Sequence, residues 1–264
     1  MPAQGRLILI TGATGAIGGE LARRYAAAGT ELVLHGRRLE VLEALAQECQ
    51  AKGASVRLSQ VALDDDPARG AWLDALPRAP DLVLLCAGMN HGVTHACDGE
   101  DGVQARALLE LNLRIPIDMA RHLAPTMQAR GSGQLVFISS LAAWFGLPVT
   151  PTYSASKAGI KAYGEALRGL LAADGVGVTV VMPGYVESSM ARAMPGPKPF
   201  LVGPERAAKR IQAGVAANRA RVSFPWPLAL GTQCLALLPP CLSERLVRWS
   251  GYGVGRLCYG FLCC

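Results

Sequence analysis

The stretch RLILITGATGAIGGELARRYAAAG, residues 6–29, decides the fold. An apolar run is followed by a helical pattern that opens near Ile17, and the turn between them carries three glycines, Gly12, Gly15 and Gly18. Glycine lets the backbone approach a phosphate closely, and the free amides at a helix start attract negative charge. A second apolar run, ELVLH, occupies residues 31–35. Strand, glycine-rich turn, helix and strand in this order predict a dinucleotide-binding unit.

The rest of the chain continues the same alternation. Four more apolar runs, SVRLSQ, DLVLLC, QLVFIS and VTVVM, are separated by helical patterns. These strands are apolar throughout, as expected where helices cover both faces of a parallel sheet. A length of 264 residues suits one domain of this kind. The predicted fold is therefore α/β, a single doubly wound parallel sheet flanked by helices, with an apolar and basic C-terminal extension.

Tyr153 and Lys157, in the stretch PTYSASKAG, lie four residues apart. On a helix this spacing puts the phenol and the ammonium on one face. A nearby cation favours the phenolate, so the lysine is expected to lower the tyrosine pKa from its ordinary value near 10. Ser140, in VFISSL, adds a hydroxyl that could hold a carbonyl or alcohol oxygen. The three residues predict proton transfer at an oxygen atom.

These motifs resemble those of the short-chain dehydrogenase/reductase family, in its single-domain branch of about 250 residues. The resemblance runs from Arg6 to about Ser189. It implies a Rossmann-type sheet and an NAD(P)-dependent oxidoreductase that exchanges a hydride between the cofactor and a carbonyl or alcohol substrate. It also implies a catalytic tetrad, matched in order by Asn112, Ser140, Tyr153 and Lys157.

The same resemblance implies the cofactor contacts. They match Gly12, Thr14, Gly15, Ile17, Gly18, Arg37, Arg38, Leu63, Ala87, Gly88, Asn112, Tyr153, Lys157, Pro183, Gly184, Val186 and Ser188. Three positions depart from the family pattern, and the first is Ala16, which stands in the glycine turn where this branch usually has a second glycine. Cys86 replaces an asparagine after the fourth strand, and Ala62, before Leu63, replaces an aspartate that often touches adenine. The last two departures affect the expected cofactor affinity more than the chemistry.

Charge at the end of the second strand favours NADP(H) over NAD(H). An acidic residue there would bind the ribose hydroxyls of NAD and repel a 2′-phosphate. The segment reads HGRRLE instead, in which Gly36 leaves space and Arg37 and Arg38 offer planar cationic donors. The alternative is that both arginines simply open the next helix as solvated residues.

Composition excludes several classes of protein. The N-terminal sequence MPAQGRLILI does not read as a secretory leader, so a cytoplasmic protein is expected, and the scattered cysteines predict reduced thiols. The four histidines lack metal-ligand spacing, so no metal site is predicted. Although the formal net charge is +6, no nucleic-acid-binding motif is present, and no nucleic-acid partner is predicted.

The last quarter of the chain has its own character. Residues 201–264 hold eight basic and two acidic side chains, whereas residues 1–200 hold eighteen of each. We expect a catalytic domain over residues 1–224 and an apolar extension over 225–264. The prolines at 225, 227, 239 and 240 leave too short an apolar run to span a bilayer. The region 221–264 remains open between a membrane-surface contact, at the inner face of a membrane, and a lid or subunit contact.

The substrate is only partly readable. By the resemblance, the pocket walls come from the segment after Ser140 and from a loop over residues 185–203, and both are apolar. Their large side chains are Trp144, Phe145, Leu147, Met190, Met194 and Phe200. A lipophilic ketone or 3-oxoacyl substrate is expected, along with the homodimer or homotetramer common in the family. Two alternatives are a non-catalytic NADP-binding sensor or scaffold, and a sugar-nucleotide epimerase or dehydratase.

Overall fold

The computed structural model describes residues 5–90, 99–194 and 196–252 of the chain. Seven strands form one sheet in the order β3-β2-β1-β4-β5-β6-β7, and every neighbouring pair is parallel. The chain first moves outward from β1 to β3 and then returns past β1 to β4. This reversal confirms the predicted doubly wound sheet, and it places a crevice at the carboxyl ends of β1 and β4.

The strands are β1 Arg6–Thr11, β2 Thr30–His35, β3 Ser55–Ser59, β4 Leu82–Leu85, β5 Gly133–Ile138, β6 Val176–Pro183 and β7 Arg221–Phe224. The α-helices are α1 Ala16–Tyr25, α2 Leu39–Gln50, α3 Asp66–Asp74, α4 Gly102–Leu109, α5 Ile115–Arg130, α6 Pro151–Leu171, α7 Ser189–Ala193, α8 Pro204–Ala216, α9 Trp226–Leu237 and α10 Pro240–Val247. Four short turns of helix are η1 Glu110–Arg114, η2 Leu141–Ala143, η3 Ala172–Asp174 and η4 Arg248–Tyr252.

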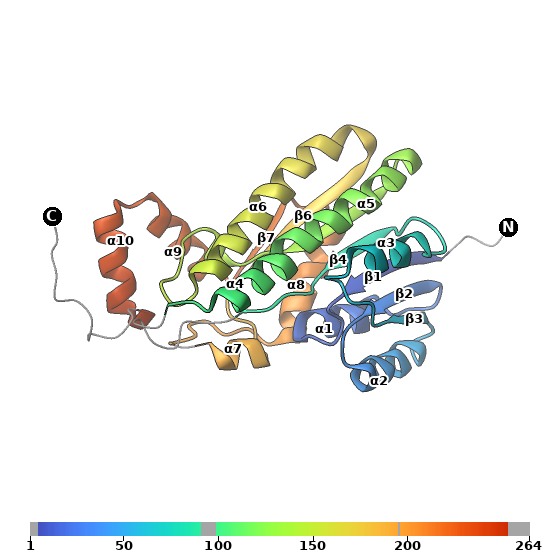
Figure 1. Cartoon of the computed structure of the whole chain (residues 1–264), viewed down its shortest axis with the longest axis horizontal. Coiled ribbons are helices and arrows are strands. Elements are labelled where there is room, and N and C mark those ends of the chain that lie inside the picture. Colours follow the sequence, from blue (N-terminus) through green and yellow to red (C-terminus); the bar gives the residue numbers. More distant parts are fainter. Residues whose placement is uncertain (1–4, 91–98, 195, 253–264) are drawn as a thin grey trace.

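Helices cover both faces of the sheet, as Figure 1 shows. Alternate residues of β1 point to opposite faces: Ile8 and Ile10 pack with α1, α2 and α8, whereas Leu7 and Leu9 pack with α3, α5 and α6. Each face is thus a continuous apolar core. This packing is why the strands are apolar throughout rather than alternating with polar residues.

The seventh strand and the C-terminal helices extend the fold beyond the predicted strands. The sequence predicted six strands and no strand at RVSF, residues 221–224, but this segment pairs with β6 as β7. After it, α9 and α10 form the end of the molecule that lies farthest from the N-terminus (Figure 1). None of the helices in the described ranges is both long and apolar enough to cross a bilayer.

Candidate active site

The glycine turn between β1 and α1 lies against the loop after β4. Gly12 has a φ of +64°, and a Cβ there would lie 2.7 Å from the Ala87 amide nitrogen. A Cβ on Gly18 would overlap the Gly12 carbonyl. Gly15 precedes α1 without a side-chain cap, which leaves first-turn amides for an anionic ligand. The turn therefore forms a cradle that could hold a phosphate. A methyl group added at Gly12 or Gly18 would not fit in this cradle.

Arg38 connects the end of β2 to this turn. Its Nη2 donates a hydrogen bond to the Thr14 carbonyl, and a Cβ on Gly36 would lie 2.7 Å from Thr14 Cγ2. Both Arg37 and Arg38 are exposed. Arg38 does precede α2, as the solvated alternative predicted, but its guanidinium folds back onto the phosphate cradle. Positive charge therefore stands beside the turn, and no carboxylate in the described parts of the chain forms an ion pair with Arg38.

The opposite wall of the crevice is built by the segments after β3 and β4. Leu63 is buried, and its carbonyl accepts a hydrogen bond from the buried Arg69. The amide of Ala87 donates to Thr11 Oγ1 over 3.2 Å, which joins the β4 loop to β1. Gly88 is the next residue, and a Cβ there would lie 3.1 Å from Asn112 Oδ1 and 3.6 Å from Lys157 Nζ. This wall therefore brings the predicted cofactor contacts up to the predicted tetrad.

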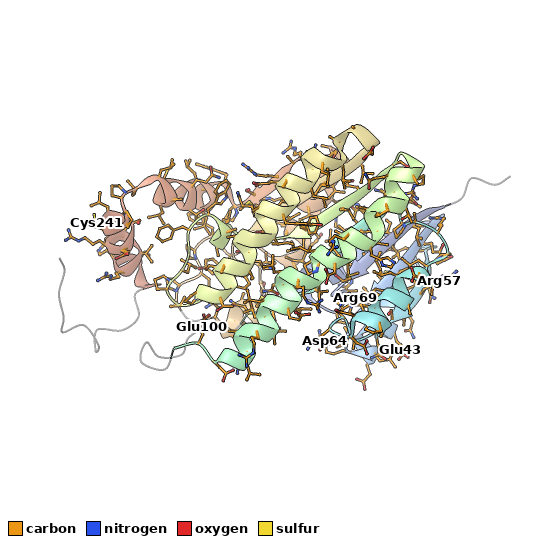
Figure 2. The ribbon with its side chains drawn as sticks, turned by 45° about the horizontal axis from the view of Figure 1, so that its top comes forward. Glu43, Arg57, Asp64, Arg69, Glu100 and Cys241 are labelled. Carbon is orange, nitrogen blue, oxygen red and sulfur yellow. The ribbon has the colours of Figure 1, made fainter. Side chains whose placement is uncertain are left out.

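Helix α6 carries Tyr153 and Lys157 in its first two turns. Glu100 fixes the start of this helix, because its carboxylate accepts hydrogen bonds from the backbone amide of Thr152 at 3.0 and 3.1 Å and from the Thr152 hydroxyl. The carboxylate also suits the positive end of the helix dipole. In Figure 2, Glu100 lies beside the lower end of α6. The tyrosine is thus held by a cap that the sequence analysis did not identify.

Lys157 is a buried cation. Its Nζ donates a 2.9 Å hydrogen bond to the Ile138 carbonyl and lies 5.5 Å from the centre of the Tyr153 ring. Burial lowers the pKa of Lys157 to about 8, and the neighbouring Cys86 opposes this shift. The same burial raises the pKa of the Cys86 thiol to about 12. The predicted pair on one helical face is therefore present, in a poorly solvated setting.

The expected effect of Lys157 on the tyrosine is not found in this structure. Burial raises the pKa of Tyr153, and the opposing, lowering influence is a side-chain hydrogen bond with Ser140. The physical reason is that desolvation penalises the phenolate more than the hydrogen bond favours it. The hydroxyls of Ser140 and Tyr153 therefore face each other as a neutral pair, with the ammonium of Lys157 on the side of the ring.

Asn112 lies in η1, a π-helical turn between α4 and α5. Its Oδ1 accepts from the Met89 amide at 2.9 Å, and its Nδ2 donates to the Met89 carbonyl at 2.8 Å and to Ser156 Oγ at 3.3 Å. The extra residue in a π-turn is frequently found at functional sites. Here the turn aims the Asn112 amide at the β4 loop, so Met89 and Ser156 join the site although no sequence motif marked them.

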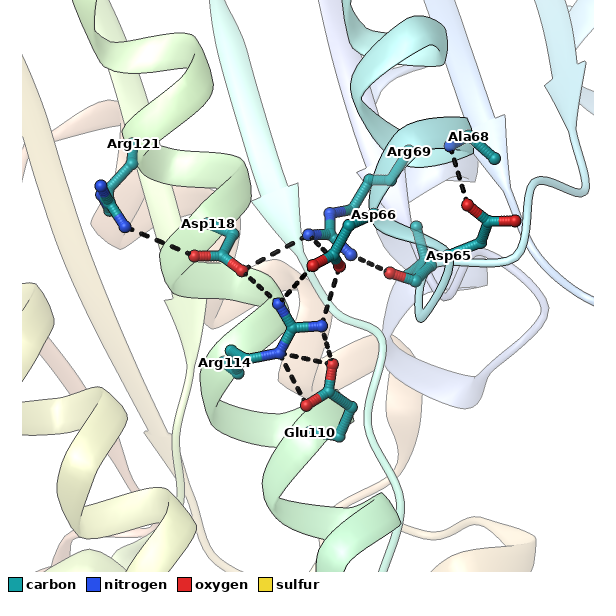
Figure 3. Close-up of polar contacts among 9 residues, drawn as sticks. Asp65, Asp66, Ala68, Arg69, Glu110, Arg114, Asp118 and Arg121 are labelled. Atoms are coloured by element: carbon teal, nitrogen blue, oxygen red, sulfur yellow. Dashed lines mark hydrogen bonds and ion pairs between the residues drawn. The ribbon is translucent and has the colours of Figure 1, made fainter.

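An ion-pair cluster holds this π-turn against α3. Figure 3 shows Arg114, the last residue of η1, between three carboxylates. The pairs join Arg114 to Glu110, to Asp66 at 2.8 Å and to Asp118 at 2.8 Å. Glu110 and Asp66 raise the pKa of Arg114, and hydrogen bonding to Arg114 lowers the pKa of Asp66 to about 2. The cluster lies two residues from Asn112 and restrains its backbone.

Ser140 and the residues after β6 complete the site. The Ser140 hydroxyl oxygen accepts from the Ala142 amide at 3.2 Å and lies 3.5 Å from the Pro183 carbonyl oxygen. A Cβ on Gly184 would come within 2.9 Å of Leu228 in α9. Ser188 begins α7 by accepting from the Ala191 amide at 3.1 Å. Val186, which precedes it, is buried and forms a parallel bridge with Val202.

The predicted pocket walls divide into two groups. Trp144 packs with Leu141 and α9, and two cations lie near its ring: Lys161 Nζ is 4.3 Å and the Arg221 guanidinium carbon is 5.2 Å from the ring centre. It is therefore a packing residue in this structure. The second group, Phe145, Leu147 and Met194, packs with Tyr185 and with Leu235 and Val247 of the C-terminal helices. Met190 and Phe200 are exposed.

Metal-binding groups were also sought. In the parts of the chain that the structure describes, no three His, Cys, Asp or Glu side chains are grouped to hold a metal ion. Two of the histidines in the sequence, His91 and His95, lie outside those parts, as do Cys97, Cys258, Cys263 and Cys264. His35 instead packs on Trp72 with ring centres 5.3 Å apart.

Comparison with known proteins gives a consistent result. The short chain dehydrogenase family profile matches residues 6–197. An uncharacterized oxidoreductase of Myxococcus xanthus is 35% identical over 246 residues, which cover 92% of this chain and 96% of the relative. A candidate NAD(P)-dependent gluconate 5-dehydrogenase of Beutenbergia cavernae, solved with NADP at low occupancy, is 25% identical with a TM-score of 0.74, covering 84% of this chain and 94% of that one.

A second solved structure has the same fold. A short-chain dehydrogenase of Sphingobium yanoikuyae in complex with NADPH has a TM-score of 0.77 at 23% identity, covering 89% of this chain and 97% of that one. The family match spans the glycine cradle and the region around Tyr153 and Lys157. The chain therefore belongs to the short-chain dehydrogenase/reductase family of NAD(P)-dependent oxidoreductases.

Proposed function

We propose that the protein reduces a carbonyl to an alcohol with NADPH, using Asn112, Ser140, Tyr153 and Lys157. The observation that carries this proposal is the side-chain hydrogen bond between Ser140 and Tyr153 beside the buried Lys157, whose Nζ lies 5.5 Å from the centre of the Tyr153 ring. These residues lie at the sheet edge that also holds the glycine cradle. Hydroxyls able to hold an oxygen and exchange a proton then lie next to a nucleotide site. Reduction of a carbonyl needs both a group that donates a proton to the oxygen and a site for the cofactor that carries the hydride.

The cradle fits a dinucleotide. Gly12 and Gly18 leave the room that a pyrophosphate requires, and the start of α1 supplies amides. The bound nicotinamide supplies the hydride that reaches the carbonyl carbon. Ser140 and Tyr153 hold the carbonyl oxygen between their hydroxyls, and Tyr153 gives that oxygen its proton. Pro183, Gly184, Val186 and Ser188 line the nicotinamide side.

Lys157 and Asn112 support this proton transfer. With a pKa of about 8, Lys157 is charged at neutral pH and stabilises the phenolate that Tyr153 becomes after it donates. It also binds the nicotinamide ribose. Asn112 orders the β4 loop through Met89 and reaches the α6 backbone region through Ser156. In this role it positions the loop, and it also holds a water that links Lys157 to solvent.

The preference for NADPH rests on Arg37 and Arg38. A 2′-phosphate at the ribose would face two cations, and Arg38 is already held at the cradle by the Thr14 carbonyl. A planar guanidinium suits phosphate oxygens, whereas NAD would leave this charge unused. We place the catalytic domain at residues 1–224, with a substrate loop at 185–203 and an extension at 225–264.

The substrate side supports a lipophilic carbonyl. Phe145, Leu147 and Met194 form an apolar cluster with Tyr185 beside the residues that follow Ser140 and Gly184. Apolar walls favour a ketone or 3-oxoacyl chain over a sugar or phosphate ester. We also propose a homodimer or homotetramer in the cytoplasm.

Tyr153→Phe tests the function directly, because it removes one oxygen atom and keeps the ring. We expect turnover with NADPH and a graded ketone panel to fall at least about 100-fold, while NADPH binding measured by fluorescence stays unchanged. Tyr163→Phe, the same substitution on the same helix, should keep full turnover. Normal turnover of the Tyr153 variant would refute the mechanism, and wild-type NADPH binding with no turnover on any carbonyl would favour a sensor.

A further inference from the structure

Helix α9 exposes large apolar side chains along one side. Trp226, Leu230, Cys234 and Leu237 are spaced four, four and three residues apart, so they share one face of the helix. All four are exposed, with Trp226 at 75% and Leu237 at 86%. The opposite face is apolar too, because Ala229 and Leu228 pack under Leu141 and Met182. A helix that is apolar all round normally has both faces covered.

Helix α10 and the turn η4 also expose large apolar side chains. Leu242, Leu246 and Trp249 are spaced four and three residues apart, and Trp249 is 89% exposed. Val247 points the other way and packs against Val149. We call the exposed side chains of Trp226, Leu230, Leu237, Leu242, Leu246 and Trp249 the outer surface. Figure 1 shows α9 and α10 at one extreme end of the molecule, where a large flat object can reach them.

Charge around the outer surface is basic. Helix α9 contains no charged residue, and α10 with η4 contributes Arg245, Arg248 and a single acid, Glu244. Glu244 is paired with Arg248 at 3.3 Å. Arg219 lies just before α9 in the sequence, whereas Arg221, which also precedes α9, is paired with Glu165 at 2.5 Å. An apolar surface with tryptophans and flanking arginines suits the boundary between lipid headgroups and acyl chains.

We propose that the outer surface binds the face of a bilayer that contains anionic lipid. The basic flanks attract acidic headgroups, and the exposed tryptophans and leucines enter the boundary layer. A second copy of the chain is a poorer occupant, because symmetric pairing would bring the arginines of the two surfaces together. The inner sides of the same helices, through Leu235 and Val247, touch the apolar cluster beside the active site. The proposal concerns binding and does not depend on the proposed reaction.

Vesicle flotation with the full chain tests this surface. The wild type should bind vesicles of phosphatidylcholine with phosphatidylglycerol, bind pure phosphatidylcholine less, and lose binding as salt is raised. Leu237→Glu and Trp249→Glu should each weaken binding at least about tenfold, since each removes apolar area and adds negative charge. Leu170→Glu is the matched control: Leu170 is 72% exposed on α6, outside the outer surface, and its variant should bind like the wild type.

Three outcomes would overturn the proposal. The first is no binding of the wild type to anionic vesicles. The second is an equal loss of binding in the Leu170 control, which would indicate a nonspecific effect of charge. The third is a wild-type oligomer, seen by light scattering, that Leu237→Glu dissociates without any change in vesicle binding, which would make the outer surface an interface between copies. Because the substituted side chains are exposed, unchanged melting curves should show that the variants fold.

Discussion

Two cations on neighbouring helices, Lys157 on α6 and Arg114 at the end of η1, have opposite surroundings. Lys157 is buried, donates to a neutral backbone carbonyl, and has its pKa lowered to about 8. Arg114 is partly exposed among three carboxylates, and its pKa is raised. A charge buried without a counter-ion is costly, and its pKa depends strongly on its neighbours, whereas ion pairing holds a group in its charged form. The surroundings of Lys157 suit proton transfer, whereas the ion pairs of Arg114 hold the backbone of η1 in place.

Lys157→Met should separate the two regions most sharply. We expect turnover to fall about 100-fold or more. The variant should also be more stable, because it removes a desolvated charge. Lowering the pKa of Lys157 from 10.5 to about 8 corresponds to a cost of about 3 kcal/mol in the folded state. The variant avoids this cost but loses the hydrogen bond to the Ile138 carbonyl. Its free energy of unfolding should therefore exceed that of the wild type by about 1–3 kcal/mol at pH 7.

The pH dependence checks this interpretation of Lys157. Below pH 8 both states of the wild type hold a charged lysine, so the cost is fully present. Between pH 8 and 10.5 the unfolded state binds the proton and the folded state does not, so wild-type stability rises and the variant's advantage shrinks. Denaturant unfolding of the wild type and of Lys157→Met at several pH values measures this difference in stability. Lys161→Met, one turn along and paired with Glu165, is the control and should keep its turnover. A constant advantage up to pH 10.5 would contradict burial as the cause.

Arg38→Ala addresses a third kind of cation, one that is exposed and bonded to a neutral carbonyl. Among the residues that the structure describes, no carboxylate pairs with Arg38, so its charge remains available to a 2′-phosphate. We expect the NADPH dissociation constant to rise about 10- to 100-fold and that for NADH to change little, as measured by titration of each cofactor. Arg57→Ala is the control, since Arg57 is committed to Glu31 at 2.7 Å. An equal loss of NADH and NADPH affinity would point to the cradle instead of the phosphate.

Arg114→Gln should have the smallest effect. Exposed ion pairs stabilise weakly even in clusters, so we expect the melting temperature to fall by no more than about 4 °C. Arg121→Gln, two turns further along and 3.7 Å from Asp118, should give no shift. The carboxylate of Asp66 has a lowered pKa of about 2, so its contribution is present above pH 3.8 and is lost as the pH falls towards 2. The difference in melting temperature between Arg114→Gln and the wild type should therefore shrink as the pH falls from 3.8 towards 2.

Much of this molecule could be predicted from local pattern. Gly12 and Gly18 marked the cradle because only glycine avoids the contacts made there, and the spacing of Tyr153 and Lys157 fixed a shared helical face. The apolar strands indicated a sheet covered on both sides. These features depend on residues near one another in sequence, where spacing and geometry are tightly linked.

Features that depend on distant residues could not be predicted in this way. Glu100 caps a helix that begins fifty residues later, and Asn112 finds Met89 and Ser156 only once the sheet has formed. Burial reversed the expected direction for the pKa of Tyr153, because desolvation is a property of the whole fold. Likewise, Trp144 looked like a pocket wall until the fold placed Arg221 of β7 and Lys161 of α6 against its ring.

The cysteines that the structure describes differ in reactivity in a way that offers an experimental handle. Burial raises the pKa values of Cys49 and Cys86, whereas Cys234 on α9 is exposed, as is Cys241 on α10, which Figure 2 labels. Since the thiolate is the nucleophile, an alkylating reagent at neutral pH would modify the C-terminal helices and spare the thiol beside Lys157. The labelling rate of Cys234 would then report how much of that end of the molecule is covered.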